Sequence, residues 1–296
     1  MMKRSLCCTL LVSSALFLFA QNDSLPATKV DTTLSIDTSK TFSVETNIDQ
    51  PIYKLKPAKD IPVFLLGAGW SGYAFTKIYS KDRTSEDRIL TLDKNDINGF
   101  DRWAVRPYSE KFGKRSNVIF VGSMPLPFLF LACKNTRSDF FKLTFLYLEA
   151  MSITGMLYTG SVYFNDRFRP YAYSYETPMA WRTRGGAKNS FYAGHVALVA
   201  TSTFFMAKVY ADYNPGSKIK WLFYSFAGAA TATIGYWRHR GGYHFPSDIL
   251  IGMTQGTLTG ILVPHFHKNK LIKDPNLSLF PYSDGQARGI SLVYKF

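Results

Sequence analysis

The chain has 296 residues, 16% of them aromatic, and a formal net charge of +14. This length allows one large domain or two small ones. A strongly basic chain suits nucleic acid, an anionic membrane surface or anionic substrates. The sequence has no run of five basic residues, no RNA-recognition signature and no zinc-finger spacing, so we predict no nucleic-acid partner.

Residues 1–20 have the pattern of a secretory signal peptide. Lys3 and Arg4 form the basic end, Leu6–Phe19 is mostly apolar, and "LFA" at the end suits cleavage. An uncleaved membrane anchor is the alternative interpretation. Without this segment the chain keeps only Cys133, which excludes an internal disulfide and a cysteine metal site. We therefore predict a protein of the bacterial cell envelope, integral to a membrane or tightly associated with one.

A polar leader at 21–60 is rich in Asp, Thr and Ser and is predicted to be flexible. Six apolar segments of 17 to 26 residues then predict an all-α, six-helix domain over 61–266. Their lengths approach that of a membrane-spanning helix. The segments are 61–79, 117–133, 139–164, 191–210, 221–237 and 249–266.

The sequence leaves both a membrane-embedded and a soluble bundle open. Lys142 and Lys208 interrupt two of the segments, and the mean hydropathy of −0.06 is low for six spans. Against this, Gly252, Gly256 and Gly260 lie on one helix face, which allows close helix packing in lipid. We therefore expect a membrane-embedded bundle.

The residues after the bundle, 267–296, form a predicted C-terminal tail. Its last nine residues, "RGISLVYKF", alternate between polar and apolar side chains and end in Phe, as the strands of outer-membrane barrels do. One such stretch does not predict a barrel. We expect a single tail strand, which could pair with the leader.

Three charged loops, 80–116, 165–190 and 238–248, alternate with short ones at 134–138 and 211–220. Alternating helices therefore place the charged loops at one end of the bundle. That end carries "RFRP" at 167–170, "SFYAGHV" at 190–196 and "RHRGGYHFPSD" at 238–248. Together these stretches supply Arg167, Arg169, Gly194, His195, Arg238, His244 and Asp248.

These side chains suit the binding and transfer of a phosphate group. Arginines bind oxyanions through bidentate, charge-assisted hydrogen bonds. Gly194, at the start of a helix, allows an anion to approach the backbone N–H groups there. His244 can attack phosphorus, and Asp248, four residues later, can accept the other ring N–H. His195 can then protonate the leaving oxygen.

The three stretches resemble, in order, the signature motifs of the type 2 phosphatidic acid phosphatase and haloperoxidase superfamily. The third motif fits at Arg238, His244 and Asp248 with its full spacing, and Trp237 stands in place of serine.

The other two motifs depart further from the family pattern. The second fits at Gly194 and His195, with Tyr192 for proline and Ala193 for serine. The first fits at Arg169 and Pro170, but Val162 occupies the position of the motif lysine. Arg167 or Lys188 could supply the missing positive charge.

The resemblance implies that His244 is the nucleophile, Asp248 its orienting residue and His195 the general acid. It also implies that Arg169, Arg238 and the Gly194 amide bind phosphate, with Arg167 beside them. The function implied is hydrolysis of a phosphomonoester or pyrophosphate of a lipid of the phosphatidic acid, lipid A or polyprenyl pyrophosphate type. The implied partners are this substrate and membrane lipids, with no protein partner.

Two other functions stay open. One is a catalytically impaired, phospholipid-binding membrane protein of the same superfamily, because the motif lysine and serine are lost. The other is a vanadium haloperoxidase, which fits the same residues. A metal site made of His195, His244 and Asp248 is disfavoured because the arginines would repel a cation, so we predict no metal and no cofactor. We expect His265 and His267, at the other end of the bundle, to be interfacial.

Overall fold

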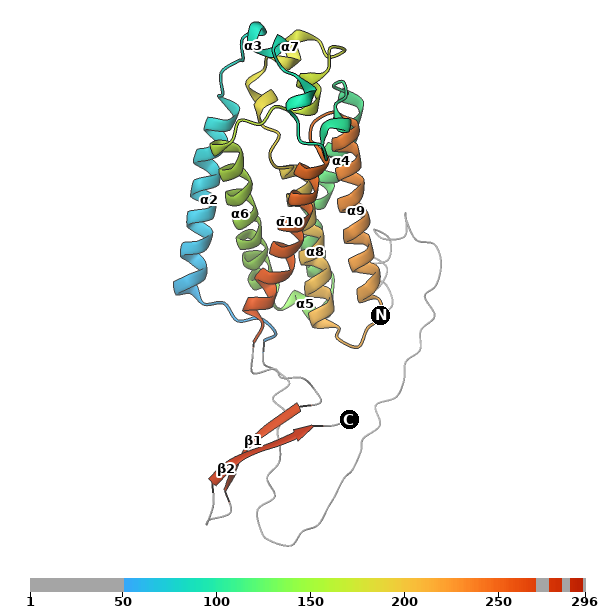
Figure 1. The fold of residues 1–296 in the computed structure, drawn as a ribbon. Helices are drawn as coiled ribbons and strands as arrows, with labels where there is room; N and C mark the ends of the chain where they lie inside the picture. Colours follow the sequence, from blue (N-terminus) through green and yellow to red (C-terminus); the bar gives the residue numbers. More distant parts are fainter. Residues whose placement is uncertain (1–50, 270–276, 284–287, 295–296) are drawn as a thin grey trace. The chain divides into compact units, whose positions relative to one another are not determined.

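A computed structural model describes residues 51–269, 277–283 and 288–294. The predicted signal peptide and most of the predicted leader lie outside these residues. Six long helices form the bundle in the described part, which confirms the predicted fold class (Figure 1). They are α2 (Pro57–Tyr79), α4 (Glu110–Ser123), α6 (Phe140–Phe164), α8 (Gly194–Tyr213), α9 (Lys220–Arg240) and α10 (Pro246–His267).

Short elements fill the connections between the long helices. They are the α-helices α3 (Glu86–Leu90), α5 (Lys134–Arg137) and α7 (Met179–Arg182), and the 3₁₀ turns η1 (Lys94–Asp96), η2 (Arg102–Ala104), η3 (Leu126–Leu131), η4 (Pro170–Tyr173) and η5 (Gly185–Lys188). Most of them belong to the long loops that gather at one end of the bundle, as the loop lengths predicted (Figure 1).

Two helix starts differ from the prediction. The first helix begins at Pro57, where a proline fits the first turn without losing a hydrogen bond, and Tyr53 before it is fully buried in the core. The second helix covers 110–123 instead of 117–133. Pro125 and Pro127 have no backbone N–H to continue the hydrogen bonds of the α-helix, and the apolar stretch continues as the 3₁₀ turn η3.

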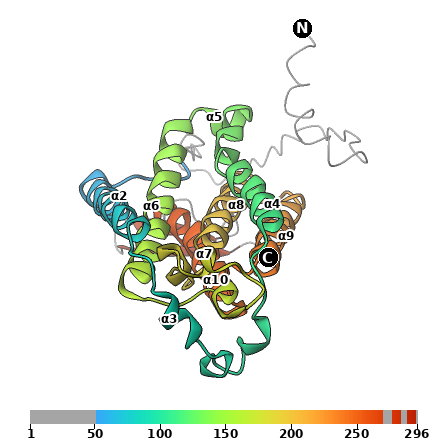
Figure 2. The ribbon, with the colours of Figure 1, turned by 90° about the horizontal axis from the view of Figure 1, so that it is seen from above.

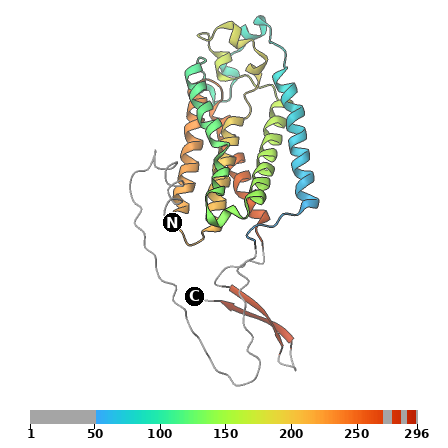
Figure 3. The ribbon, with the colours of Figure 1, turned by 180° about the vertical axis from the view of Figure 1, so that it is seen from behind.

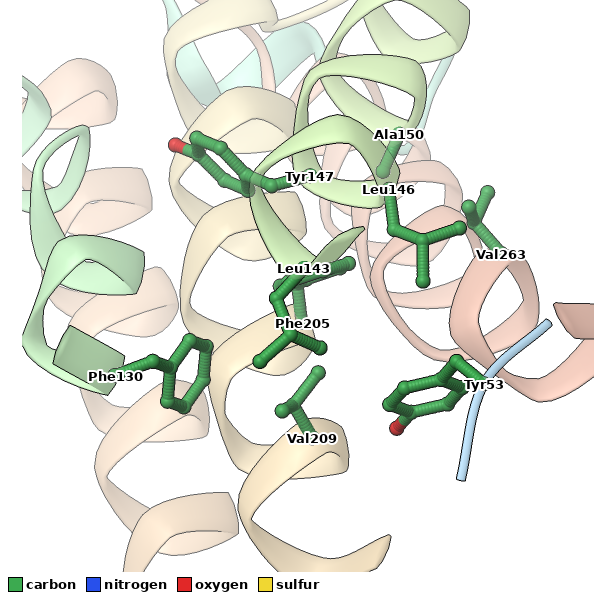
Figure 4. Packing of buried hydrophobic residues seen from close by; sticks show 9 residues of the cluster. All are labelled: Tyr53, Phe130, Leu143, Leu146, Tyr147, Ala150, Phe205, Val209 and Val263. Carbon is green, nitrogen blue, oxygen red and sulfur yellow. The ribbon is translucent and has the colours of Figure 1, made fainter. Parts of the chain in front are cut away.

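Helix α8 occupies the middle of the bundle and packs against α4, α6, α9 and α10 (Figure 2). From behind, α4 lies alongside α9 (Figure 3). The largest core cluster joins α6, α8 and α10, where Leu146 packs with Phe205 and Val263 (Figure 4). Apolar side chains of neighbouring helices therefore hold α8 in place through burial.

The predicted glycine face of α10 lies directly on α8. A Cβ atom added to Gly256 would lie 2.1 Å from the carbonyl oxygen of Ala197, and one on Gly252 would lie 2.7 Å from that of Ala193. At Gly260 the nearest atom would be the Thr201 oxygen, at 2.6 Å. The two backbones therefore approach as closely as only glycine allows.

Two described helices, Phe140–Phe164 and Pro246–His267, are long and apolar enough to cross a membrane. Large apolar side chains are also exposed on other helices, among them Leu66 on α2, Val118 on α4 and Trp221 on α9. The bundle thus has an apolar outer surface as well as an apolar core.

The C-terminal tail forms a two-stranded hairpin of its own. Strand β1 (Leu277–Ser283) pairs antiparallel with β2 (Arg288–Tyr294), with Leu277 opposite Tyr294. The predicted tail strand is therefore present, and it pairs with the strand that precedes it.

We expect Gly256→Ala to destabilise the bundle by about 1–3 kcal/mol, because the new methyl group would overlap the Ala197 carbonyl. Thermal unfolding in detergent measures the effect. Gly228→Ala on α9 is the matched control, because an added Cβ there meets nothing within 4 Å. Equal melting temperatures for the two variants would contradict this account of the packing.

Candidate active site

Backbone hydrogen bonds connect the first and second motif stretches. Arg167 forms a parallel bridge with Asn189, and the Ser190 N–H donates to the Arg167 carbonyl at 3.0 Å. The Arg169 N–H donates to the Ala187 carbonyl at 2.8 Å. The segment after α6 therefore runs alongside the segment that leads into α8.

The third motif stretch is joined to the other two in the same way. The Tyr171 N–H donates to the Gly242 carbonyl, and the Ala193 N–H donates to the Asp248 carbonyl, each at 3.1 Å. Gly242 has φ +74, and an added Cβ would lie 2.9 Å from the Pro107 carbonyl oxygen. This position thus requires glycine both for its backbone and for the space around it.

His244 lies in the loop between α9 and α10 and is 2% exposed. Its Nδ1 is 2.7 Å from the Ser190 carbonyl oxygen. A carbonyl only accepts, so Nδ1 carries the hydrogen and Nε2 keeps its lone pair. Burial, then the positive charges of Arg169 and Arg238, lower the pKa of His244 well below its usual value. The ring is therefore a neutral base with a free nitrogen.

Asp248 does not accept the ring hydrogen of His244, which corrects the direct contact predicted from their spacing. The Ser190 carbonyl takes that place. The fully buried carboxylate of Asp248 accepts from Arg167 at 2.5 Å, from the Ser190 hydroxyl at 2.6 Å and from the Phe245 N–H at 2.9 Å. Asp248 thus holds Ser190, and Ser190 orients His244.

Arg167 is placed differently from the prediction that it binds phosphate. One of its nitrogens, Nη1, pairs with Asp248, and the other, Nη2, pairs with Asp101 at 2.7 Å. Its guanidinium also lies over the Phe245 ring, 4.7 Å from the centroid. Two carboxylates therefore neutralise Arg167, and its role is to connect segments of the chain.

Asp101 is a residue of this network that sequence reasoning missed. It lies in the loop between α3 and α4, is fully buried, and accepts from the Ser247 N–H at 3.0 Å and from Asn98 at 2.9 Å. Burial raises its pKa, but hydrogen bonds from Ser247, Asn98 and Arg167 outweigh burial, so the pKa is lowered. Nothing in the local pattern "DINGFDRW" reveals a partner 66 residues away.

Two further arginines lie near the same aromatic ring. The guanidinium carbons of Arg238 and Arg169 lie 4.6 and 5.5 Å from the ring centroid of Tyr243. Neither forms an ion pair within the described part of the chain, and the Nε atom of Arg238 is buried without a hydrogen-bond partner there. Two neighbouring cations without a counter-ion form a strong site for an anion.

His195 and Gly194 border the same site. The Arg238 Nη2 lies 2.5 Å from the His195 Nδ1. Since arginine only donates, Nδ1 accepts and Nε2 carries the hydrogen. Gly194 begins α8, and an added Cβ would lie 2.5 Å from the Tyr158 ring, so glycine is required. The first N–H groups of α8 have no acceptors inside the helix and are available to an anion.

The motif-lysine position is filled by a buried apolar side chain. Val162 is fully buried and packs with Ala74 and Ile78 of α2. Lys81 reaches this end of α6, where its Nζ donates to the Val162 carbonyl at 2.8 Å and pairs with Asp166 at 2.7 Å. Lys188, which the sequence suggested as a substitute, also faces Asp166, at 3.8 Å.

Residues 143–272 match the PAP2 superfamily. All three motif stretches lie within this range, and the matched family is the one that the motifs resemble. A crystal structure of a transmembrane PAP2-type phosphatidylglycerolphosphate phosphatase from Bacillus subtilis is similar at 19% identity. The similarity covers 73% of this chain and 98% of that chain, with a TM-score of 0.41. No curated protein matches the chain.

We expect Asp101→Ala to destabilise the protein by about 3 kcal/mol or more, because it leaves part of the buried Arg167 network unpaired. Denaturant unfolding measures this loss. Asp96→Ala in the same loop is the matched control, since Asp96 is exposed. If both variants unfold at the same denaturant concentration as the wild type, Asp101 has no role in stabilising the site.

Proposed function

We propose that this protein is a phosphatase that releases phosphate from a lipid-linked phosphomonoester or pyrophosphate through a phosphohistidine at His244. The observation that carries the proposal is the pairing of His244 with the Ser190 carbonyl. That hydrogen bond leaves Nε2 as a free nucleophile, and Arg169 and Arg238 are close enough to lower the pKa of the ring. The same arginines would neutralise the charge that develops on the phosphoryl oxygens.

The reaction would proceed in two displacements on phosphorus. First, Nε2 of His244 forms a bond to phosphorus as the bond to the lipid oxygen breaks. His195 supplies a proton to that oxygen. In the present arrangement Arg238 donates to Nδ1 of His195; a bound phosphate would compete for that donor and leave Nδ1 free to take up a proton. Water then attacks phosphorus, the bond to Nε2 of His244 breaks, and His195 takes up the proton of the water as phosphate is released.

A lipid substrate suits the surface around this site. An apolar groove of about 450 Å³ is lined by Leu157 of α6 and by Leu250, Ile251 and Leu258 of α10. Leu250 follows Asp248 by only two residues, so the groove begins beside the polar end. We propose an integral membrane protein of the cell envelope whose substrate presents its phosphate to the motif residues and its chains to this groove. Phosphatidic acid, lipid A and polyprenyl pyrophosphate share these properties.

A catalytically impaired lipid-binding protein is the second candidate. The observation in its favour is that Val162 is fully buried at the motif-lysine position, so one phosphate-binding cation of the family pattern is lost. Phosphate release by the purified wild-type protein from a panel of the three lipid classes separates the two candidates. Binding without turnover on every substrate would favour the impaired protein.

We expect His244→Ala to lower phosphate release by about 10³-fold or more, because it removes the nucleophile. Vanadate should inhibit the wild type, since it mimics phosphorus at five-coordination. His265→Ala is the control, because His265 is exposed at the other end of α10. Full turnover by His244→Ala would rule out the phosphohistidine. Bromide oxidation in the presence of vanadate would instead indicate a haloperoxidase.

The pH profile gives a further test. Because the pKa of His244 is lowered, its ring stays neutral on the acid side of pH 6.5, and kcat/KM should persist there. Arg169→Gln removes a positive charge that favours the neutral ring, so the pKa should rise and the acidic limb should move to higher pH. The measurement is kcat/KM against pH for both proteins. An unchanged acidic limb would contradict this electrostatic coupling.

A further inference from the structure

Three titratable side chains from three helices meet at the other end of the bundle. Asp60 lies in the first turn of α2, Glu149 lies on α6, and His267 is the last residue of α10. The His267 Nε2 is 3.2 Å from an Asp60 oxygen and 3.6 Å from a Glu149 oxygen. The side chain of His267 is only 12% exposed, so it lies between the helices.

Hydrogen bonding fixes which nitrogen of His267 faces the carboxylates. Its Nδ1 lies 2.7 Å from the Val263 carbonyl oxygen, so Nδ1 carries the hydrogen. Nε2 of the neutral ring then points a lone pair at Asp60 and Glu149. Lone pairs and carboxylate oxygens repel one another unless a cation lies between them.

The two carboxylates are also without a compensating charge from lysine or arginine. Asp60 is 5% and Glu149 is 4% exposed. In the described part of the chain, His267 is the one basic side chain within 4.0 Å of either. The Glu149 Oε2 is buried with no hydrogen-bond partner there. Burying such a group costs several kcal/mol unless something binds it.

We propose that Asp60, Glu149 and His267 bind a zinc ion. Their ligand atoms all lie within 4.8 Å of one another. In a tetrahedral site with bonds of about 2.0–2.1 Å, neighbouring ligand atoms are about 3.3 Å apart. The observed distances from the His267 Nε2, 3.2 Å to the Asp60 oxygen and 3.6 Å to the Glu149 oxygen, match that spacing. One imidazole with two carboxylates favours zinc over magnesium or calcium, which prefer oxygen ligands alone.

Outer contacts already orient two of the three ligands. The Val263 carbonyl holds the His267 ring, and the Lys56 N–H donates to the second oxygen of Asp60 at 2.5 Å. Such second contacts are usual around metal ligands. The site is about 28 Å from Asp248 along α10, from a rise of 1.5 Å per residue. The ion would therefore join the start of α2 and the end of α10 to the first half of α6 and take no part in phosphate chemistry.

The test measures metal content and stability, not phosphatase activity. Tag-free, full-length protein in detergent is stripped with chelator, dialysed against zinc and analysed for bound metal. We expect one zinc per chain and a melting temperature raised by about 5 °C or more with zinc. X-ray absorption at the zinc edge should show nitrogen and oxygen ligands near 2.0 Å and no sulfur.

Variants separate a metal site from a proton shared between His267 and Asp60. Glu149→Gln should lose the zinc, yet melt higher than the wild type in chelator, because it removes the repulsion between the ligands. His267→Ala should also lose the zinc, whereas the exposed His265→Ala should keep it. No zinc bound to the wild type, or equal zinc in wild type and Glu149→Gln, would overturn the proposal.

Discussion

The fully buried carboxylate of Asp248 connects the three motif stretches at one end of the bundle. It accepts hydrogen bonds from Arg167 of the first motif stretch, from Ser190 of the second and from the backbone of its own stretch. A buried carboxylate is tolerated only when its oxygens are paired in this way. Since Ser190 in turn orients His244, the orientation of the proposed nucleophile depends on a carboxylate that does not contact it.

This network also divides the arginines into two kinds. Arg167 lies between Asp101 and Asp248 and is neutralised by them. Arg169 and Arg238 both lie near the Tyr243 ring and pair with no carboxylate in the described part of the chain. The first arginine therefore connects segments of the chain, and the other two carry the positive charge that we propose binds phosphate. The loss of the motif lysine at Val162 leaves these two to carry most of that charge.

Close packing of α8 on α10 sets the distance between the second and third motifs. The glycine face brings the α10 backbone against the Ala193 and Ala197 carbonyls, and the Ala193 N–H donates to Asp248. Gly194 and Asp248 therefore begin their helices side by side. A larger residue on this face would separate the anion-binding turn of α8 from the carboxylate.

The order and spacing of the motifs, the six apolar segments and the glycine repeat were sufficient to predict the family match of residues 143–272, the helical bundle and the end where the three motif stretches lie together. These features can be recognised from the sequence because helix periodicity and the spacing within each motif depend on residues that are close together along the chain. Asp101, the Ser190 carbonyl and the pairing of Arg167 were beyond sequence reasoning. Their partners lie 54 to 146 residues away, and a backbone carbonyl carries no sequence signal. Only the tertiary structure decided which arginines stay unpaired, because packing determines which buried charges meet.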